Sequence, residues 1–265
     1  MVSKHRWRGH LSCYFRIYIG FCHANAGAWP ELQKCLIDLN STAQKFDVPI
    51  TGSLDLFVKY LKGIYYQGIG ALDKALRVFK DEAFRNSQRK GSLTPSAMQF
   101  ERDLGILAAL NQLSIYQESK RQDKAKNKVL LEQLKTRCEN HANKHIETAW
   151  NVLAAAIVTE PPMAMHETKA HLKKALNGAS STKNTQFLCI TLSLMFNHFF
   201  SNIVGEQAEK SARAASVQAQ YNGNPLWRSV ADGALARCLE VQGKHEEAQV
   251  TLRYAQNFAR AVLPH

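Results

Sequence analysis

Apolar residues recur three and four positions apart along almost the whole chain, which is the spacing that places them on one face of an α-helix. The 14 Gly and 7 Pro residues are few and scattered, which favours long helices with short turns over a many-stranded β fold. The pattern therefore predicts an all-α protein, with helices at residues 5–26, 30–46, 54–67, 72–84, 97–116, 127–138, 146–159, 165–176, 188–204, 206–219, 227–242 and 245–263.

The segments between these helices carry residues that begin and end helices. Ser53 is expected to cap the helix that follows it, because a serine hydroxyl can accept a hydrogen bond from a free N–H of the first turn. A loop is expected at residues 178–183. Two longer polar loops, near residues 85–96 and 117–126, are rich in Lys and Arg.

Neighbouring helices joined by a turn centred on one Gly are typical of a solenoid of antiparallel helix pairs. The tetratricopeptide (TPR) repeat requires small residues where its two helices cross, and Gly where the first helix ends. One unit matches this pattern at Gly63, Tyr66, Gly70, Ala75 and Phe79. The predicted fold class is thus an all-α, TPR-like antiparallel helix-pair solenoid, forming a single domain over residues 1–265.

The other units match the repeat less evenly. The C-terminal unit matches at Ala236, Gly243, Ala248, Leu252 and Ala255. The N-terminal unit has Leu32 where Ala is expected. A unit turning at Gly205 would place His198 and Lys210 where small residues are expected. The repeat assignment therefore depends mainly on two units.

A TPR superhelix offers a binding surface along the first helix of each pair, which lines a concave groove. The groove residues predicted here are Tyr14, Ile17, Phe21, Phe57, Tyr60, Ile64, Gln67, Leu192, Met195 and Phe199. They are apolar and aromatic with few charges, so the groove suits an extended or helical protein segment better than nucleic acid. The alternative is that neighbouring helices cover these side chains.

The chain is basic, with 34 Lys and Arg against 22 Asp and Glu and a formal charge of +12. This balance suggests an acidic partner such as nucleic acid, an acidic peptide or a membrane surface, although two solvated basic surfaces would also account for it. The apolar stretch at residues 11–22 is too short to span a membrane, and its amphipathic character argues against a signal peptide. Contact with a membrane is not expected.

Sequence motifs of catalysis are missing: there is no GxSxG, HExxH, P-loop or GxGxxG pattern. His141 and His145 have a spacing that could hold a metal on one helix face, but no third ligand is evident, and a solvated face is favoured. The six Cys residues form no CxxC pair and are interpreted as buried, reduced thiols. No catalytic residue, metal or cofactor is therefore expected, and the protein is predicted not to be an enzyme.

Several stretches resemble a known family. They lie at residues 60–68, 72–79, 102–111, 222–227 and 243–248. Together they are similar to the fungal cohesin-loading-factor family, the TPR subunit of the cohesin loader. The resemblance covers most of the chain. Because members of that family usually carry further repeats on the N-terminal side, the chain resembles the C-terminal portion of one.

The resemblance implies a nuclear role in sister-chromatid cohesion and chromosome segregation. Proteins of this family wrap their superhelix around the extended N-terminal segment of a large HEAT-repeat adherin of the Nipped-B type, and the pair loads cohesin onto chromatin. The groove would then bind adherin, cohesin would be an indirect partner, and the basic loops would be free to meet chromatin or DNA. Two alternatives stay open: a TPR adaptor of another assembly, proteasome-lid-like or anaphase-promoting-complex-like, and a helical array that binds a small ligand.

Overall fold

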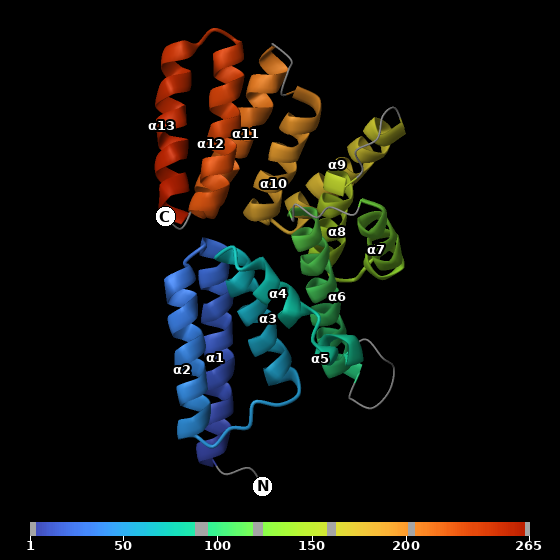
Figure 1. Cartoon of the computed structure of the whole chain (residues 1–265), viewed down its shortest axis with the longest axis vertical. Coiled ribbons are helices and arrows are strands. Elements are labelled where there is room, and N and C mark those ends of the chain that lie inside the picture. Colours follow the sequence, from blue (N-terminus) through green and yellow to red (C-terminus); the bar gives the residue numbers. More distant parts are fainter. Residues whose placement is uncertain (1–3, 88–94, 119–123, 158–162, 201–204, 263–265) are drawn as a thin grey trace. The chain divides into compact units, whose positions relative to one another are not determined.

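The computed structural model describes residues 4–87, 95–118, 124–157, 163–200 and 205–262 (Figure 1). Regular structure in these ranges is helical and includes no strand, so the predicted all-α class is confirmed. The elements are α1 (Lys4–Ala26), α2 (Trp29–Lys45), α3 (Ser53–Gly68), α4 (Leu72–Phe79), α5 (Glu82–Asn86), α6 (Pro95–Glu118), α7 (Lys124–Cys138), α8 (Lys144–Ile157), α9 (Met163–Ser181), α10 (Thr185–Met195), the π-helical turn η1 (Phe196–Phe200), α11 (Glu206–Asn222), α12 (Pro225–Val241) and α13 (His245–Val262).

The chain forms two compact units, residues 1–119 and residues 120–265. We call them unit 1 and unit 2. Each has apolar clusters of its own and is described by itself. A single solenoid running through residues 1–265 stays a prediction.

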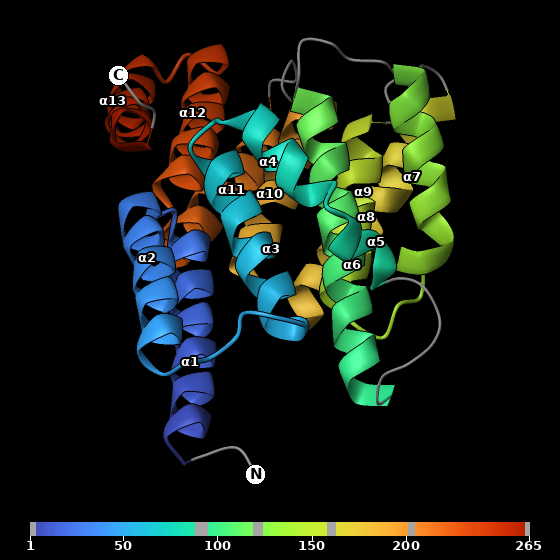
Figure 2. The same ribbon diagram turned by 60° about the horizontal axis from the view of Figure 1, so that its bottom comes forward.

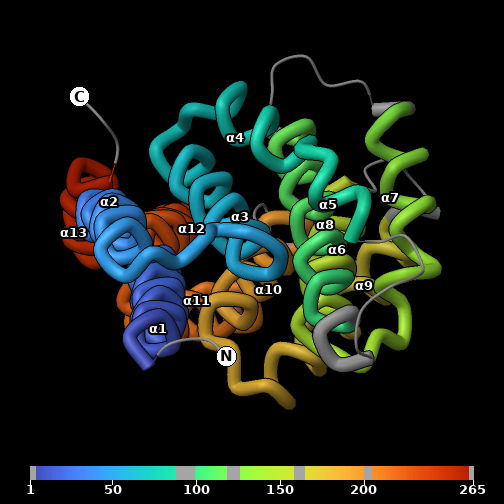
Figure 3. The backbone as a smooth tube through the Cα atoms, turned by 90° about the horizontal axis from the view of Figure 1, so that it is seen from below, coloured from blue at the N-terminus to red at the C-terminus, as the bar shows by residue number. Residues whose placement is uncertain are grey.

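Unit 1 is built from helices that pack against their neighbours in sequence. In it, α3 lies between α1 and α6 and contacts both (Figures 2 and 3). The helix α2 packs against α1, and α4 packs against α3. One face of the unit is thus formed by α1, α3 and α6 side by side, and this face carries the candidate site described below.

The crossing of α3 and α4 depends on a glycine. A Cβ at Gly63 would lie 2.5 Å from the ring of Phe79, closer than any real Cβ approaches. Phe79 is 1% exposed, and Ala75 beside it on α4 is fully buried. The expectation of small residues at this crossing is therefore confirmed, and the Phe79 ring occupies the space that Gly63 leaves.

Two local predictions in unit 1 are wrong. The helix expected over residues 72–84 stops at Phe79, because the Asp81 carboxylate accepts a hydrogen bond from the Ala83 N–H and caps a new helix, α5. Ser53 does not cap α3 and lies inside it, after the N-cap residue Gly52. Its hydroxyl donates a 2.6 Å hydrogen bond to the Glu101 carboxylate of α6, so a tertiary contact has replaced the local one.

Unit 2 contains three helix pairs, α8–α9, α10–α11 and α12–α13. The last four helices run side by side in Figure 1. The helices α10 and α12 also contact each other, as do α8 and α10. The buried face of α11 consists of small residues, Ala208, Ser211, Ala212, Ala215 and Ala219, which lets this helix approach its neighbours closely.

The loop predicted at residues 178–183 is largely helical, since α9 continues to Ser181. Gly178 lowers helix propensity, but it lies against α8, where an added Cβ would clash with the Thr148 hydroxyl. The close approach of two helices therefore explains this glycine. The helix ends at Ser181, and Lys183 in the turn that follows takes a left-handed conformation with φ 53°.

The repeat register predicted for α10 and α11 is also wrong. Lys210 is exposed and pairs with Glu206 at 2.6 Å, so it does not lie at a helix crossing. Ala208 takes that place, fully buried beside Phe196, which is 1% exposed at the start of the π-helical turn. Counting in both directions from Gly205 therefore selected the wrong residues, since His198 is exposed as well.

An ion-pair network joins α11 to α13 and to Lys244, which lies in the turn between α12 and α13. Glu209 accepts hydrogen bonds from Lys244 at 2.7 Å and from Arg213 at 2.9 Å, and Arg213 also contacts Glu247. The hydrogen bond from Lys244, followed by that from Arg213, lowers the pKa of Glu209 below its ordinary value. Lys244 and Arg213 thus bind the ionised carboxylate of Glu209 more tightly than they bind the protonated acid.

Replacing Glu209 with Gln is expected to lower the free energy of unfolding at pH 7 by about 0.5–1 kcal/mol, because partly exposed pairs are screened by solvent. A lowered folded-state pKa stabilises the fold above the unfolded pKa of about 4.3, and this contribution disappears as the pH falls through the folded pKa. Urea denaturation at pH 7 and at pH 3 should show a difference from wild type only at pH 7. An equal difference at both values would contradict the ionic origin.

Candidate partner-binding site

Four aromatic rings from three helices gather on the face formed by α1, α3 and α6. They are Tyr14, Phe21, Phe57 and Phe100, and we call them the aromatic patch. Phe57 is at the centre, with ring centroids 5.1 Å from Phe100 and 6.2 Å from both Tyr14 and Phe21. Tyr14 is 41% exposed and Phe100 is 54% exposed, whereas Phe21 and Phe57 are half-buried. The patch is therefore anchored in the core and open to solvent at its edges.

Two of the predicted groove residues lie in the core of unit 1. Ile17 is 3% exposed and packs in the cluster that joins α1, α2 and α3. Tyr60 is 6% exposed, and its hydroxyl accepts a 3.0 Å hydrogen bond from Asn111 of α6. Burial raises the pKa of Tyr60 to about 12. Both side chains hold the helices together and cannot meet a partner while unit 1 is folded.

The remaining predicted residues of α3 are half-buried. Ile64 packs on the cluster formed by α3, α4 and α6. Gln67 donates a 3.4 Å hydrogen bond to the Ser114 hydroxyl of α6. Both residues contribute to the contact between α3 and α6, at some distance along α3 from Phe57.

The predicted residues of unit 2, namely Leu192, Met195 and Phe199, are also half-buried. Leu192 packs on a cluster that contains Cys189 and Ala231. The ring of Phe199 lies 6.2 Å from that of His198. Their role in binding a partner stays a prediction.

The sequence did not reveal Phe100 or Glu101, which come from the first turns of α6. No repeat register was assigned to that helix, so none of its residues entered the predicted groove. A useful signal was present, because Phe100 and Glu101 follow a basic loop and begin an apolar helical run. Only the packing of α6 against α3 brings them to Phe57.

Glu101 follows Phe100 in the sequence, lies at the contact of α6 with α3, and is 8% exposed. One carboxylate oxygen accepts the hydrogen bond from Ser53, one turn before Phe57 on α3. Its charge also reaches Tyr14: burial, followed by the negative charge of Glu101, raises the pKa of the Tyr14 hydroxyl above its ordinary value. A buried negative charge therefore lies next to the rings of the patch.

The first helix exposes a second apolar surface. Trp7, Phe15 and Tyr18 are each more than 60% exposed, and Leu11 is 42% exposed. These residues recur three and four apart, a pattern that the sequence already shows. The opposite side of α1 is buried in the core, so this helix carries apolar side chains on both its buried side and its exposed side.

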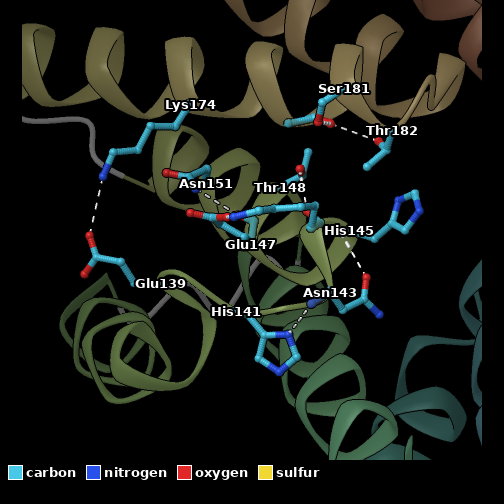
Figure 4. A network of polar contacts seen from close by, with 12 residues as sticks. Glu139, His141, Asn143, His145, Glu147, Thr148, Asn151, Lys174, Ser181 and Thr182 are labelled. Carbon is cyan, nitrogen blue, oxygen red and sulfur yellow. Dashed lines mark hydrogen bonds and ion pairs between the residues drawn. The ribbon is translucent and has the colours of Figure 1, made fainter.

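No metal site is found among the residues that the structure describes: none of them form a group of three His, Cys, Asp or Glu able to hold an ion. His141 and His145 do not share a helix face, because His141 lies in the turn before α8, where its Nδ1 accepts a hydrogen bond from the Asn143 N–H (Figure 4). The side-chain Oδ1 of Asn143 in turn accepts a hydrogen bond from the His145 N–H. These polar groups shape the start of α8.

The six cysteines are free thiols, as the sequence indicated. Five are buried, whereas Cys22 is exposed. Burial raises the pKa of Cys138 to about 12 and that of Cys189 to about 11, so both are protonated and weakly nucleophilic at neutral pH.

Among the helices of the described residues, none has the length and hydropathy that a membrane-spanning helix requires.

A comparison with protein families decides what kind of protein carries this site. The model of the cohesin loading factor family matches residues 1–246. The chain belongs to the cohesin loading factor family. No curated protein and no solved structure matches it. The family gives the chain a role in cohesin loading, as a loader subunit and not as a known enzyme.

The basic regions of this cohesin loading factor lie partly outside the described residues, since the loops near 85–96 and 117–126 include residues 88–94 and 119–123. Within the described part, α7 carries several Lys and Arg side chains on a short helix. Some are neutralised locally, for example Lys135 by Glu132 at 3.4 Å. A direct contact with chromatin or DNA stays a prediction.

Proposed function

We propose that this chain is a non-catalytic, TPR-like scaffold that binds the N-terminal segment of a HEAT-repeat adherin, and that in the nucleus the pair loads cohesin onto chromatin for sister-chromatid cohesion. The single observation that carries the proposal is the aromatic patch. Three helices that are far apart in the sequence each present a ring to the same exposed face. Such a face provides the anchors that an extended segment requires.

The helix packing supports the TPR-like part of this proposal. In unit 2 each pair packs against the next, and α8, α10 and α12 contact one another in turn. In unit 1 the helices α1, α3 and α6 do the same. A face lined by the first helix of each pair is the arrangement by which solenoids bind extended ligands.

The energetics of the patch support a protein ligand. Binding energy at protein interfaces concentrates in a few aromatic and Arg residues, and burying one exposed aromatic side chain contributes about 1.5–3 kcal/mol. Tyr14 and Phe100 are exposed enough to lose considerable apolar area on binding. Phe21 and Phe57 are already held in place by the core, so little side-chain entropy is lost there.

Replacing Tyr14 and Phe100 together with Ala is expected to weaken binding of a fluorescently labelled adherin N-terminal segment at least tenfold in anisotropy titrations. Both side chains are exposed, so the melting temperature should change little. The matched control replaces Tyr221 and Tyr254, which are 75% and 57% exposed on α11 and α13, and should bind as wild type does.

Two results would count against the proposal in different ways. Equal weakening by the control pair would mean that no particular surface binds the segment. If the wild-type chain itself shows no affinity for the adherin segment, the assignment to adherin is wrong and another protein ligand must be sought for the patch.

A further inference from the structure

Glu101 is a buried acid with little compensation. It is 8% exposed, and the hydrogen bond from the neutral Ser53 hydroxyl is its one identified contact with a donor. Among the described residues, no Lys, Arg or His forms an ion pair with it. Removing a carboxylate from water is costly unless a cation or several hydrogen bonds replace the water. Folding alone would therefore favour a neutral side chain at this position.

The position of this charge is specific. Glu101 follows Phe100, the most exposed ring of the patch, and is bonded to Ser53, one helical turn from Phe57. Its charge is felt at Tyr14 across the face. A ligand that lies on the rings would thus be close to an anionic group.

Aromatic faces and a carboxylate attract the same kind of group. The face of an aromatic ring is electrostatically negative and binds cations, and Arg does so more often than Lys. The planar guanidinium of Arg can stack on a ring while its N–H groups donate to a carboxylate. The ammonium of Lys is more strongly hydrated and lacks a flat face.

We infer that the aromatic patch binds an arginine side chain of the partner segment, stacked on the rings of Tyr14, Phe57 and Phe100 and paired with the Glu101 carboxylate. This inference rests on the proposed function, because it specifies the chemistry of the segment that occupies the patch. The charge complementarity selects a basic segment although the chain as a whole carries +12. An acidic segment would be repelled from this position.

The inference predicts that Glu101→Gln weakens binding of the adherin segment at least tenfold. The melting temperature should stay the same or rise, because the variant removes a poorly compensated buried charge. Substitution of a residue with only a structural role would lower both the affinity for the segment and the melting temperature. Glu132→Gln, an exposed acid of α7 that is 71% exposed in its side chain, is the matched control and should change neither.

The arginine is identified by replacing each Arg of the segment in turn with citrulline, which keeps the shape and removes the charge. One replacement should weaken binding to the wild-type chain tenfold or more and have little further effect on Glu101→Gln, which is the signature of direct coupling. The inference is overturned if Glu101→Gln binds the segment as tightly as wild type. It is also overturned if every citrulline replacement weakens binding to Glu101→Gln as much as it weakens binding to the wild-type chain.

Failure of the proposed function can be distinguished from failure of the inference. If the wild-type chain does not bind the adherin segment, acetyl-arginine-amide is compared with acetyl-citrulline-amide by saturation-transfer NMR on the full chain. Stronger saturation of the arginine compound, lost in Glu101→Gln and kept in Glu132→Gln, would support the arginine site without adherin. Equal saturation of the two compounds would overturn it.

Discussion

Replacing Phe79 with Ala is expected to lower the free energy of unfolding of unit 1 by about 3–5 kcal/mol. The side chain is 1% exposed and packs in the cluster that joins α3, α4, α5 and α6. Its ring lies 5.9 Å from that of Tyr60 and contacts the backbone at Gly63. Removing it leaves a cavity at the crossing of two helices, and neither helix can move inward without displacing α6.

This prediction is tested by urea denaturation followed by circular dichroism, with Phe100→Ala as the control for an exposed ring. A second variant tests the cause. Gly63→Ala alone should cost about 1–3 kcal/mol by overpacking against Phe79. In the Phe79→Ala background the same methyl group should cost almost nothing, because the space is empty. Additive effects of the two substitutions would show that the two residues do not share this space.

Replacing Asp232 with Ala is expected to lower the stability of unit 2 by about 3 kcal/mol, near the lower end for breaking a buried ion pair. Asp232 is 3% exposed on α12. Its carboxylate accepts a hydrogen bond from the Ser216 hydroxyl of α11 and a 2.8 Å bond from Arg228. The Arg228 guanidinium in turn lies 5.1 Å from the ring centroid of Phe258 on α13.

The cost arises because one substitution leaves two polar groups without their acceptor and loosens three helices together. Thermal denaturation of the full chain measures it. The matched control is Glu240→Ala, since Glu240 pairs with His245 at 3.0 Å while both side chains are more than half exposed. That substitution should cost less than about 0.5 kcal/mol. A similar loss in both variants would contradict the special role of the buried carboxylate.

How far the sequence predicted the candidate site can be judged residue by residue. Tyr14, Phe21 and Phe57 were expected on one face, and their rings meet there. Ile17 and Tyr60 have the same helical spacing, but they point into the core. Helical periodicity gives the direction of a side chain only to within a fraction of a turn, which is not enough to separate the edge of a core from its surface.

The sequence by itself determined most of the helices and the turns that are centred on glycines. The spacing of apolar residues and the glycines with positive φ, such as Gly27, Gly70 and Gly243, act over a few residues. A short stretch of sequence is therefore enough to show where such a helix forms and where it ends. The family resemblance was likewise present in the sequence and is confirmed.

Only the tertiary structure decided which residues meet. The helix α9 continues through Gly178, and the Ser53 hydroxyl donates to Glu101 instead of capping α3. Ala208 lies at the helix crossing where the repeat pattern indicated Lys210. Each of these outcomes depends on a contact with a different helix. The free energy of such a contact is set by the shape and charge of both surfaces, so it cannot be inferred from the residues of one helix alone.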